Sequence, residues 1–495
     1  MNVTSSDSAA TLGWRTGLLV FLAVLILALP QAALLPLLDR DEPRFSEASR
    51  EMLQSGEYTV PTFNHAPRYA KPPLIYWCQT VTYSLFGENA FAARLPSLLA
   101  TAGAAWLLAA WGARLGSAPT GVGAGLCYAL CLQTVQQGRV ATADALLIFF
   151  MTLTAYAGWR LISEPPASHS TRSYFWDTLL ALGFAGGFLA KGPEALLPLI
   201  PLLVCARGTG SRVVGEITVN FVIGLIVVLF WAIPAYIKTN GDYWRVGLGH
   251  DVGDRMISGG FQGHGASNIG GYLLTLPYYI LLFWLSALPW SPLLLTHGKK
   301  LFSSWKPDRV ETYLLLNAGL IFLVFSLMIT KLPHYTLPAF PFLALFFVRR
   351  WNLSGLRPAL PIKLAAGFGL AFTLLTLVLV PIALASHATP SPTGELVRAA
   401  GDNLKPDTQF ALVDFQEPNT IWEMRRVVKG YGPAIPPEKV LSFLDQPGPR
   451  AVLLSSALWQ KLSAHTPAPS WKTFEARGIN AAKVGSIDLT LVVKP

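Results

Sequence analysis

The sequence predicts a polytopic α-helical membrane protein with a small α/β domain at its C-terminal end. Of the 495 residues, 52% are hydrophobic and only 13% are charged, whereas soluble domains carry roughly a quarter charged residues. The mean hydropathy is +0.44, and long apolar runs recur up to residue 384. Short apolar segments then alternate with helical patterns, which is typical of an α/β domain. We therefore expect a membrane domain over 1–390 and an α/β domain over 393–495.

About eleven apolar runs are predicted membrane spans, since each crossing needs about 20 residues. The first run is long enough to cross and many others follow it, so we interpret it as an uncleaved helix and not as a signal peptide. The shorter runs must extend into flanking polar residues to span the bilayer. The predicted spans are 17–38, 91–111, 120–132, 141–159, 178–190, 193–205, 214–237, 271–295, 313–328, 337–348 and 364–384.

Charges between the spans predict their orientation. If the N-terminus is cytoplasmic, alternate counting places the connections rich in Lys and Arg inside, as the positive-inside rule requires. The stretch 178–205 can be one helix or two, and we prefer two because a reversal at 191–193 keeps the arginines on both flanks inside. The outer side then holds the C-terminal domain and four polar segments, which are 39–73, 136–144, 238–270 and 331–335.

The net charge of +10 does not indicate a nucleic-acid partner, because many Lys and Arg residues lie in short segments between apolar runs. The four cysteines lie in or beside apolar segments. Their spacing fits neither a metal site nor a disulfide framework, so we interpret them as small buried side chains. They are Cys78, Cys127, Cys131 and Cys205.

The C-terminal domain is predicted to contain three strands and two helices. No glycine-rich phosphate-binding fingerprint occurs in it. The predicted strands are 409–415, 450–455 and 487–493, and the predicted helices are 420–428 and 457–463.

The densest polar cluster follows the first span and contains Asp41, Glu42 and Arg44. Carboxylates at a membrane boundary can bind cations or accept protons. The structural alternative is a solvated cap before an amphipathic interfacial helix over 45–53, and this run alone slightly favours that alternative.

Arg68 and Lys71 form a second cluster, directly before two prolines. The prolines disfavour helix here and hold Lys71 at a bend. A lysine in that place can pair with a phosphate, and snorkelling to the interface is the structural alternative.

Asp144 lies at the outer end of an otherwise apolar run. A carboxylate at that depth is costly, so a function is the default hypothesis, and pairing with Arg139 is the structural alternative. Lys191 and Glu194 flank a Gly-Pro break, where they can pair with each other.

Two outer segments add candidate ligands. His264 stands among glycines, where a metal ligand or a substrate contact and a surface histidine are almost equally well supported. Lys331, His334 and Tyr335 bring a cation, an imidazole and a phenol to one turn. This combination suits a diphosphate or phosphosugar headgroup, and an interfacial aromatic belt is the alternative. All these clusters are predicted to face one side of the membrane, which indicates a shared external site.

In these residues the chain resembles the superfamily of lipid A aminoarabinose transferases and protein O-mannosyltransferases, which has the GT-C fold of membrane helices with external juxtamembrane helices. The resemblance covers nearly all of the membrane region and keeps the order of the motifs. The matching segments are 41–44, 50–58, 68–73, 76–77, 85–87, 190–192, 288–290 and 331–335.

The resemblance implies an inverting glycosyltransferase in a bacterial inner membrane, with a cytoplasmic N-terminus and a periplasmic C-terminal domain. The donor would be a polyprenyl-phosphate sugar, such as an undecaprenyl-phosphate glycoside of aminoarabinose or another pentose or hexose. Lipid A or another envelope glycolipid would be the acceptor. Asp41 matches the acidic residue that acts as general base or positions the acceptor, and Asp144 matches a second external carboxylate.

The resemblance also assigns the residues that would bind the donor. Arg44, Lys71 and Tyr335 match positions associated with the lipid phosphate, and Arg68, Lys191 and Lys331 are further donor-binding candidates. A departing phosphate needs its growing charge stabilised, and fixed cations supply that.

Two departures from the family pattern bear on the metal and the substrate. His264 matches a metal-associated histidine, but Ala70 stands where the aminoarabinose transferases usually have a metal-linked glutamate. Ala70 therefore argues against a bound divalent metal and leaves the substrate open. The chain also has about two fewer predicted spans than those transferases.

Other functions remain as alternatives. One is a transferase that acts on protein, cell-wall polymer or O-antigen. Hydropathy alone also allows a transporter, but no internal repeat is visible and the polar residues gather on one predicted face.

Overall fold

The computed structural model describes most of the chain, and its tertiary contacts divide the chain into two compact units. One unit contains Met1–Ala33, Tyr69–Cys78 and Arg94–Leu375, and the other contains Leu34–Arg68, Gln79–Ala93 and Thr376–Pro495. The described residues are 4–37, 41–163, 171–247, 249, 269–303, 305–385, 392–415, 417–425, 434–464, 471–480 and 485–495.

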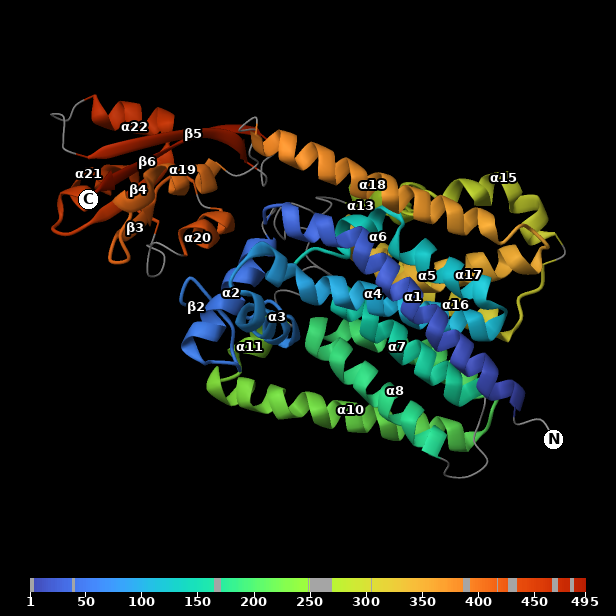
Figure 1. Cartoon of the computed structure of the whole chain (residues 1–495). Coiled ribbons are helices and arrows are strands. Elements are labelled where there is room, and N and C mark those ends of the chain that lie inside the picture. The colour runs from blue at the N-terminus through green and yellow to red at the C-terminus, as the bar shows by residue number, and fades with distance from the viewer. Residues whose placement is uncertain are drawn as a thin grey trace. The chain divides into compact units, whose positions relative to one another are not determined.

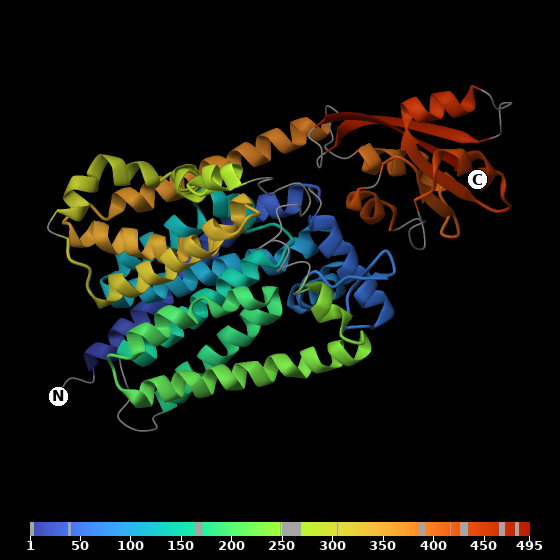
Figure 2. The same cartoon turned by 180° about the vertical axis from the view of Figure 1, so that it is seen from behind.

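The first unit is a helical bundle, which Figures 1 and 2 show from opposite sides. Its helices begin with α1 (Thr4–Leu34), α3 (Leu74–Phe86), α4 (Ala90–Leu115), α5 (Ala118–Ala129), α6 (Leu132–Gln137), α7 (Asp144–Ser163), α8 (Thr171–Lys191), η1 (Pro193–Leu196), α9 (Leu199–Ala206), α10 (Ser211–Lys238) and α11 (Asp242–Trp244). They continue with α13 (Ile269–Thr275), α14 (Tyr278–Ser286), α15 (Ser291–Phe302), α16 (Arg309–Leu327), η4 (Pro333–Ala339), α17 (Phe340–Leu353) and α18 (Ala359–Ala385).

Within the described part of the chain, seven helices are long and apolar enough to cross a membrane, and the chain is a multi-pass membrane protein. Full-length spans are thus fewer than the eleven runs that the sequence suggests. Most of the run 120–132 lies in α5, a helix of 12 residues, and most of 337–348 lies in α17, a helix of 14 residues. Both helices are largely buried. Irregular backbone at the ends of such short helices is tolerated within a membrane where protein surrounds it. The seven are Gly13–Leu34, Ala90–Leu115, Asp144–Ser163, Ser211–Lys238, Ile269–Ser286, Arg309–Leu327 and Ala359–Ile382.

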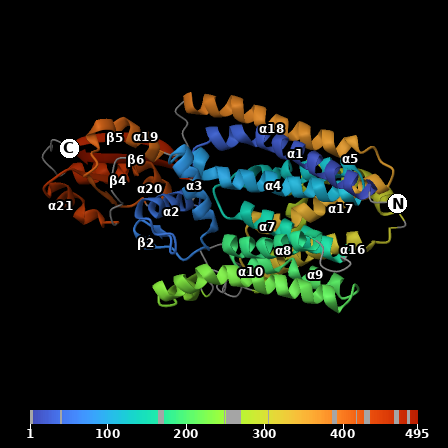
Figure 3. The ribbon, with the colours of Figure 1, turned by 60° about the horizontal axis from the view of Figure 1, so that its bottom comes forward.

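Helix α8 packs between α7 and α10 (Figure 3). Glycines permit the close approach to α7. A Cβ atom on Gly183 would lie 2.6 Å from Thr154 Oγ1, and one on Gly186 would lie 2.4 Å from the Phe150 ring. Small residues at such contacts let helix backbones approach closely in membranes.

The break after α8 confirms that 178–205 forms two helical segments. Gly192 adopts a left-handed conformation with φ 84°, which glycine reaches without steric cost. Before the break, Lys191 reaches the first residue of α7, and after it Leu202 of α9 lies against Gly158, 14 residues further along α7. The chain therefore reverses its direction at Gly192.

The second unit contains the segment that follows α1, which was predicted as the first external loop. Its helix α2 (Asp41–Ser55) confirms the amphipathic helix predicted over 45–53. The hairpin of β1 (Thr62–Phe63) and β2 (Ala66–Pro67) follows it. The Glu51 carboxylate accepts hydrogen bonds from Thr62 Oγ1 (2.5 Å) and from the turn amides of Asn64 (2.6 Å) and His65 (3.1 Å). One buried carboxylate thus fixes the hairpin to the helix.

A four-stranded sheet in the order β3-β4-β6-β5 forms the centre of the C-terminal domain. β3 and β4 are parallel, and the other two pairs are antiparallel. The three predicted strands and the helix predicted over 457–463 are confirmed, whereas the helix predicted over 420–428 ends at Met424 and residues 426–428 lie outside the described ranges. Strand β5 and helices α19 and α21 are additional. The elements are α19 (Pro392–Ala400), η5 (Gly401–Asn403), β3 (Gln409–Leu412), α20 (Pro418–Met424), η6 (Pro437–Lys439), α21 (Val440–Asp445), β4 (Arg450–Ser455), α22 (Ser456–Ser463), β5 (Lys472–Asn480) and β6 (Gly485–Lys494).

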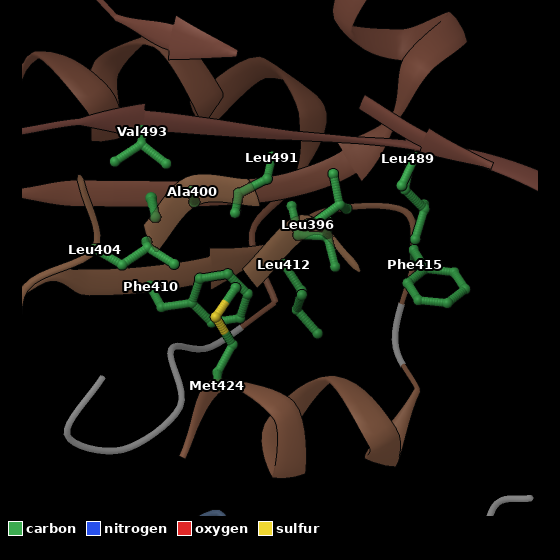
Figure 4. Packing of buried hydrophobic residues seen from close by; sticks show 13 residues of the cluster. Leu396, Ala400, Leu404, Phe410, Leu412, Phe415, Met424, Leu489, Leu491 and Val493 are labelled. Carbon is green, nitrogen blue, oxygen red and sulfur yellow. The ribbon is translucent and has the colours of Figure 1, made fainter. Parts of the chain in front are cut away.

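Alternate residues of the strands build a core on each face of the sheet, as the two-residue period of a strand requires. Figure 4 shows one core, where Phe410 and Leu412 of β3 face Met424 of α20. Ala411 and Val413 belong to the core on the opposite face, which includes residues of α21 and α22.

Candidate functional site

A buried ion cluster at the start of α7 is the centre of the candidate site. The Lys191 ammonium at the end of α8 lies 2.8 Å from Asp144 Oδ1 and 3.1 Å from Glu194 Oε2. The Lys191 side chain is 6% exposed, so these charges are shielded from solvent. The structure thus pairs Asp144 with Lys191, which is 47 positions further along the chain, and Glu194 joins the same cluster three positions after Lys191.

The Asp144 carboxylate is held on both of its oxygens. Thr142 Oγ1 donates to Oδ2 at 2.9 Å, and the other oxygen accepts from Lys191. The imidazole of His334 is also close enough to interact with this carboxylate electrostatically. A carboxylate that is engaged in this way is suited to orienting a cation.

Tyr335 forms one wall of the cluster. It is buried, and the Lys191 ammonium lies 5.4 Å from the centre of its ring. Its own segment is tied to the bundle, because Tyr279 donates to the Leu332 carbonyl at 3.0 Å and Gln133 donates to the Pro333 carbonyl. The structure therefore places the predicted Tyr335 beside Lys191.

A pocket joins Lys191 to Lys71, the predicted phosphate-binding lysine. The pocket encloses about 30 Å³, which is room for about two waters. Its walls combine the two cations with aromatic rings, which suits the phosphate end of an anionic ligand, whereas a whole phosphosugar is larger than this space. The lining residues are Tyr69, Ala70, Lys71, Pro72, Phe188, Lys191, Gly192, Pro193, Trp231, Tyr243, Trp244 and Gly247.

Tyr243 holds the segment that carries Lys71. Its hydroxyl donates to the Lys71 carbonyl at 2.6 Å, and its ring lies 5.3 Å from the rings of both Tyr69 and Trp231. Sequence reasoning missed Tyr243, because it lies 172 positions from Lys71 and no local pattern links the two.

Lys331 has a local role in the structure. Its ammonium donates to the carbonyls of Ser326 (2.7 Å) and Met328 (2.6 Å), at the end of α16, and lies 5.4 Å from the Tyr272 ring centre. A cation bonded to the last carbonyls stabilises a helix C-terminus. Burial lowers the pKa of this lysine.

The other predicted residues belong to the second unit. Asp41 is exposed in the first turn of α2, 3.7 Å from the guanidinium of Arg44. Glu42 is buried, and the Arg68 guanidinium stacks 5.1 Å from the Phe45 ring centre. Asp41 and Glu42 at a helix N-terminus also fit the capping role that was the structural alternative.

The predicted metal ligand His264 lies outside the described residues. Within the ranges that the structure describes, no three His, Cys, Asp or Glu side chains gather closely enough to bind a metal ion. Ala70, which lines the pocket, contributes no ligand atom there.

Comparisons with known proteins identify the family and the fold. The family model of dolichyl-phosphate-mannose-protein mannosyltransferases matches residues 70–237. The fold resembles that of ArnT from Cupriavidus metallidurans bound to undecaprenyl phosphate, with a TM-score of 0.75 at 16% identity over 96% of this chain and 97% of that one.

A curated relative is the undecaprenyl phosphate-α-4-amino-4-deoxy-L-arabinose arabinosyl transferase of Edwardsiella ictaluri. It is 30% identical over 389 residues, which are 76% of this chain and 67% of the relative. The chain belongs to the GT-C family of membrane glycosyltransferases. The transferase of the same name from Pseudomonas aeruginosa strain LESB58 is 31% identical over 62% of this chain and 54% of its own length. The chain thus spans about half to two thirds of these relatives.

Membership of the GT-C family confirms the predicted fold and enzyme class. The family model covers Lys71, Asp144, Lys191 and Glu194 but ends before Tyr243, so the ion cluster and most of the pocket lie in the matched region. The roles of the individual residues stay predictions.

Proposed function

We propose that this glycosyltransferase takes a sugar from a polyprenyl-phosphate carrier, such as undecaprenyl phosphate, and transfers it to lipid A or another envelope glycolipid. The reaction would take place on the outer face of a bacterial inner membrane, with the N-terminus in the cytoplasm. The observation that carries the proposal is the pocket that Lys71 and Lys191 share, because two cations beside aromatic rings suit the phosphate of a lipid-linked sugar.

The chemistry requires little more than charge stabilisation and alignment. An acceptor oxygen forms a bond to the anomeric carbon of the sugar while the bond from that carbon to the carrier phosphate breaks, which inverts the configuration. The polyprenyl phosphate leaves with the electron pair. Its growing charge is met by the ammonium groups of Lys71 and Lys191, which are already in place.

Asp144 and Glu194 act through Lys191 in this scheme. The ammonium has three N–H donors, and two of its neighbours are these carboxylates, at 2.8 Å and 3.1 Å. They orient the cation and keep it charged in a buried place. We therefore assign Asp144 as a positioning residue, although the family resemblance suggested a catalytic carboxylate.

Asp41 acts on the acceptor in the same proposal. If the acceptor is a hydroxyl group, this carboxylate takes its proton. If the acceptor is a phosphate, it is already anionic and Asp41 mainly orients it. The exposed position of Asp41 at the start of α2 leaves it accessible to a substrate.

Turnover in nanodiscs tests the function. Wild type and Asp41→Asn are compared with a panel of radiolabelled polyprenyl-phosphate sugars and a bacterial envelope extract as acceptor. We expect wild type to release label from one carrier, and Asp41→Asn to be slower by on the order of 10- to 100-fold. The molecule that becomes labelled identifies the acceptor.

The control variant for Asp41→Asn is Asp402→Asn, an acidic residue of the C-terminal domain that is also exposed. We expect it to turn over like wild type. A folded wild-type protein that releases label from no carrier would contradict the proposed function. Full activity of Asp41→Asn would instead leave the proposed transferase activity standing and show that Asp41 has no role in it.

A protein acceptor is the second candidate, because the family model that matches is that of protein mannosyltransferases. In the same experiment, label would then appear in protease-sensitive material and not in the glycolipid fraction.

Replacing Tyr243 with phenylalanine tests how the donor pocket is held. The variant loses one hydrogen bond to the Lys71 carbonyl, which contributes about 1 kcal/mol. We expect the KM for the donor to rise by about fivefold with little change in kcat, as measured by initial rates over a donor titration. Tyr174→Phe, at the opposite end of α8, is the matched control, and equal kinetics of both variants would contradict the role of Tyr243.

A further inference from the structure

Arg425 connects the C-terminal domain to the segment that precedes α4. It follows α20, and its guanidinium lies 3.7 Å from the Trp422 ring centre. The same group donates to the carbonyls of Trp422 (2.5 Å) and Glu88 (3.1 Å). The face of the planar guanidinium thus lies on the Trp422 ring, and its N–H groups bind two carbonyls. A lysine ammonium cannot make this combination of contacts.

Helix α2 packs against α20. On α2, Arg50 binds Glu47 with two hydrogen bonds of 2.9 and 2.6 Å, and both side chains are less than 10% exposed. Burial raises the pKa of Glu47, and the charges of Arg50 and Arg425 oppose that rise. Arg425 is therefore close enough to α2 for its charge to act on a buried carboxylate there.

Tyr83 of α3 completes the contact between α2 and α20. Its hydroxyl donates to the Ser46 carbonyl of α2 at 3.2 Å, and its ring stacks on Trp422 with 6.2 Å between ring centres. Trp422 is buried as well. Trp422 therefore contacts Arg425 on one hand and Tyr83, the residue bonded to α2, on the other.

We propose that Arg425 is a positioning residue of the C-terminal domain, which holds α2 and thereby orients Asp41, the first residue of that helix, toward the acceptor. The inference rests on the proposed function of Asp41. It also gives the C-terminal domain a task in the transfer reaction, since α20 belongs to that domain.

The length of α2 makes this coupling effective. Glu47 and Asp41 are six residues apart on one rigid helix, a distance of about 9 Å along its axis. A small tilt at Glu47 therefore moves the Asp41 carboxylate, and a displacement of about 1 Å can cost on the order of 100-fold in rate.

Hydrogen exchange of the full-length protein in nanodiscs tests the coupling without any substrate. In Arg425→Ala we expect the amides of α2 and of the 62–67 hairpin to exchange about tenfold faster, and those of α7 and α8 to be unchanged. Arg477→Ala is the matched control, because this arginine of the same domain is 80% exposed and pairs with Asp488 across β5 and β6. Unchanged exchange in α2 would overturn the proposal.

Kinetics then decide whether Arg425 acts through Asp41. We expect Arg425→Ala to lower kcat by 10- to 100-fold at an unchanged donor KM, and Arg425→Lys to recover part of the loss. The double variant with Asp41→Asn should be no slower than Asp41→Asn alone. If the double variant instead loses activity by the product of the two single-variant losses, the proposal is overturned. A wild-type protein without transferase activity would instead contradict the proposed function, and the exchange result would still test the coupling.

Discussion

Replacing Lys191 with methionine is expected to lower kcat/KM for the lipid-linked donor by on the order of 100- to 1,000-fold. Methionine keeps the length of the side chain and removes the charge that meets the leaving phosphate. No other cation is described within the same ion cluster, where Lys191 is bound by Asp144 and Glu194. Lys191→Met should therefore lose stabilisation of the transition state, in which the leaving phosphate gains charge.

Misfolding is the competing explanation for such a loss, because removing Lys191 leaves two carboxylates without their cation. Breaking a buried pair on one side costs about 3–5 kcal/mol. The double variant Lys191→Met with Asp144→Asn removes both charges, while the more exposed Glu194 can be solvated. We expect this variant to be as stable as wild type and as inactive as Lys191→Met.

Steady-state turnover over a donor titration measures the effect, with thermal unfolding in nanodiscs as the test of folding. Lys299→Met is the matched control, since this exposed lysine lies in the last turn of α15 and outside the pocket. Activity within tenfold of wild type in a folded Lys191 variant would show that Lys71 alone carries the phosphate.

The sequence predicted the members of this site but not their pairing. Asp144 and Lys191 each stood out as ionisable residues at the ends of apolar runs, which is a local signal. Their contact depends on α7 and α8 packing through Gly183 and Gly186, and single positions do not show which helices are neighbours. The local alternative, a pair with Arg139, was visible only because Arg139 is close in the sequence.

The same reason limits what could be predicted for the second unit. The helix 45–53 and three strands of the C-terminal sheet follow from periodicity, and the structure confirms them. The contact of Arg425 with the Glu88 carbonyl joins residues 337 positions apart. Arg425 carries no local signal, since an arginine after a short helix is usually a solvated residue.

Truncating Glu311 to alanine is expected to lower the free energy of unfolding of the bundle by about 3–5 kcal/mol. Glu311 lies in the first turn of α16 and its side chain is 2% exposed. It pairs with Arg349 at 3.2 Å and with Arg350 at 3.8 Å, and it accepts from Trp305 Nε1 at 2.8 Å. Alanine leaves both guanidinium groups without this partner, and Arg349 alone retains Asp308, at 2.5 Å.

Conservative and exposed variants separate this effect from a general loss of charge. Glu311→Gln keeps an acceptor for Trp305 and should lose less stability than Glu311→Ala. Asp488→Ala breaks an exposed pair and should lose much less stability than either variant. Thermal and denaturant unfolding in detergent rank the three variants by their loss of stability. Because Glu311 is at the opposite end of α16 from Tyr335, the folded fraction of Glu311→Ala should keep the wild-type kcat. Equal unfolding of Glu311→Ala and wild type would mean that water already solvates this cluster.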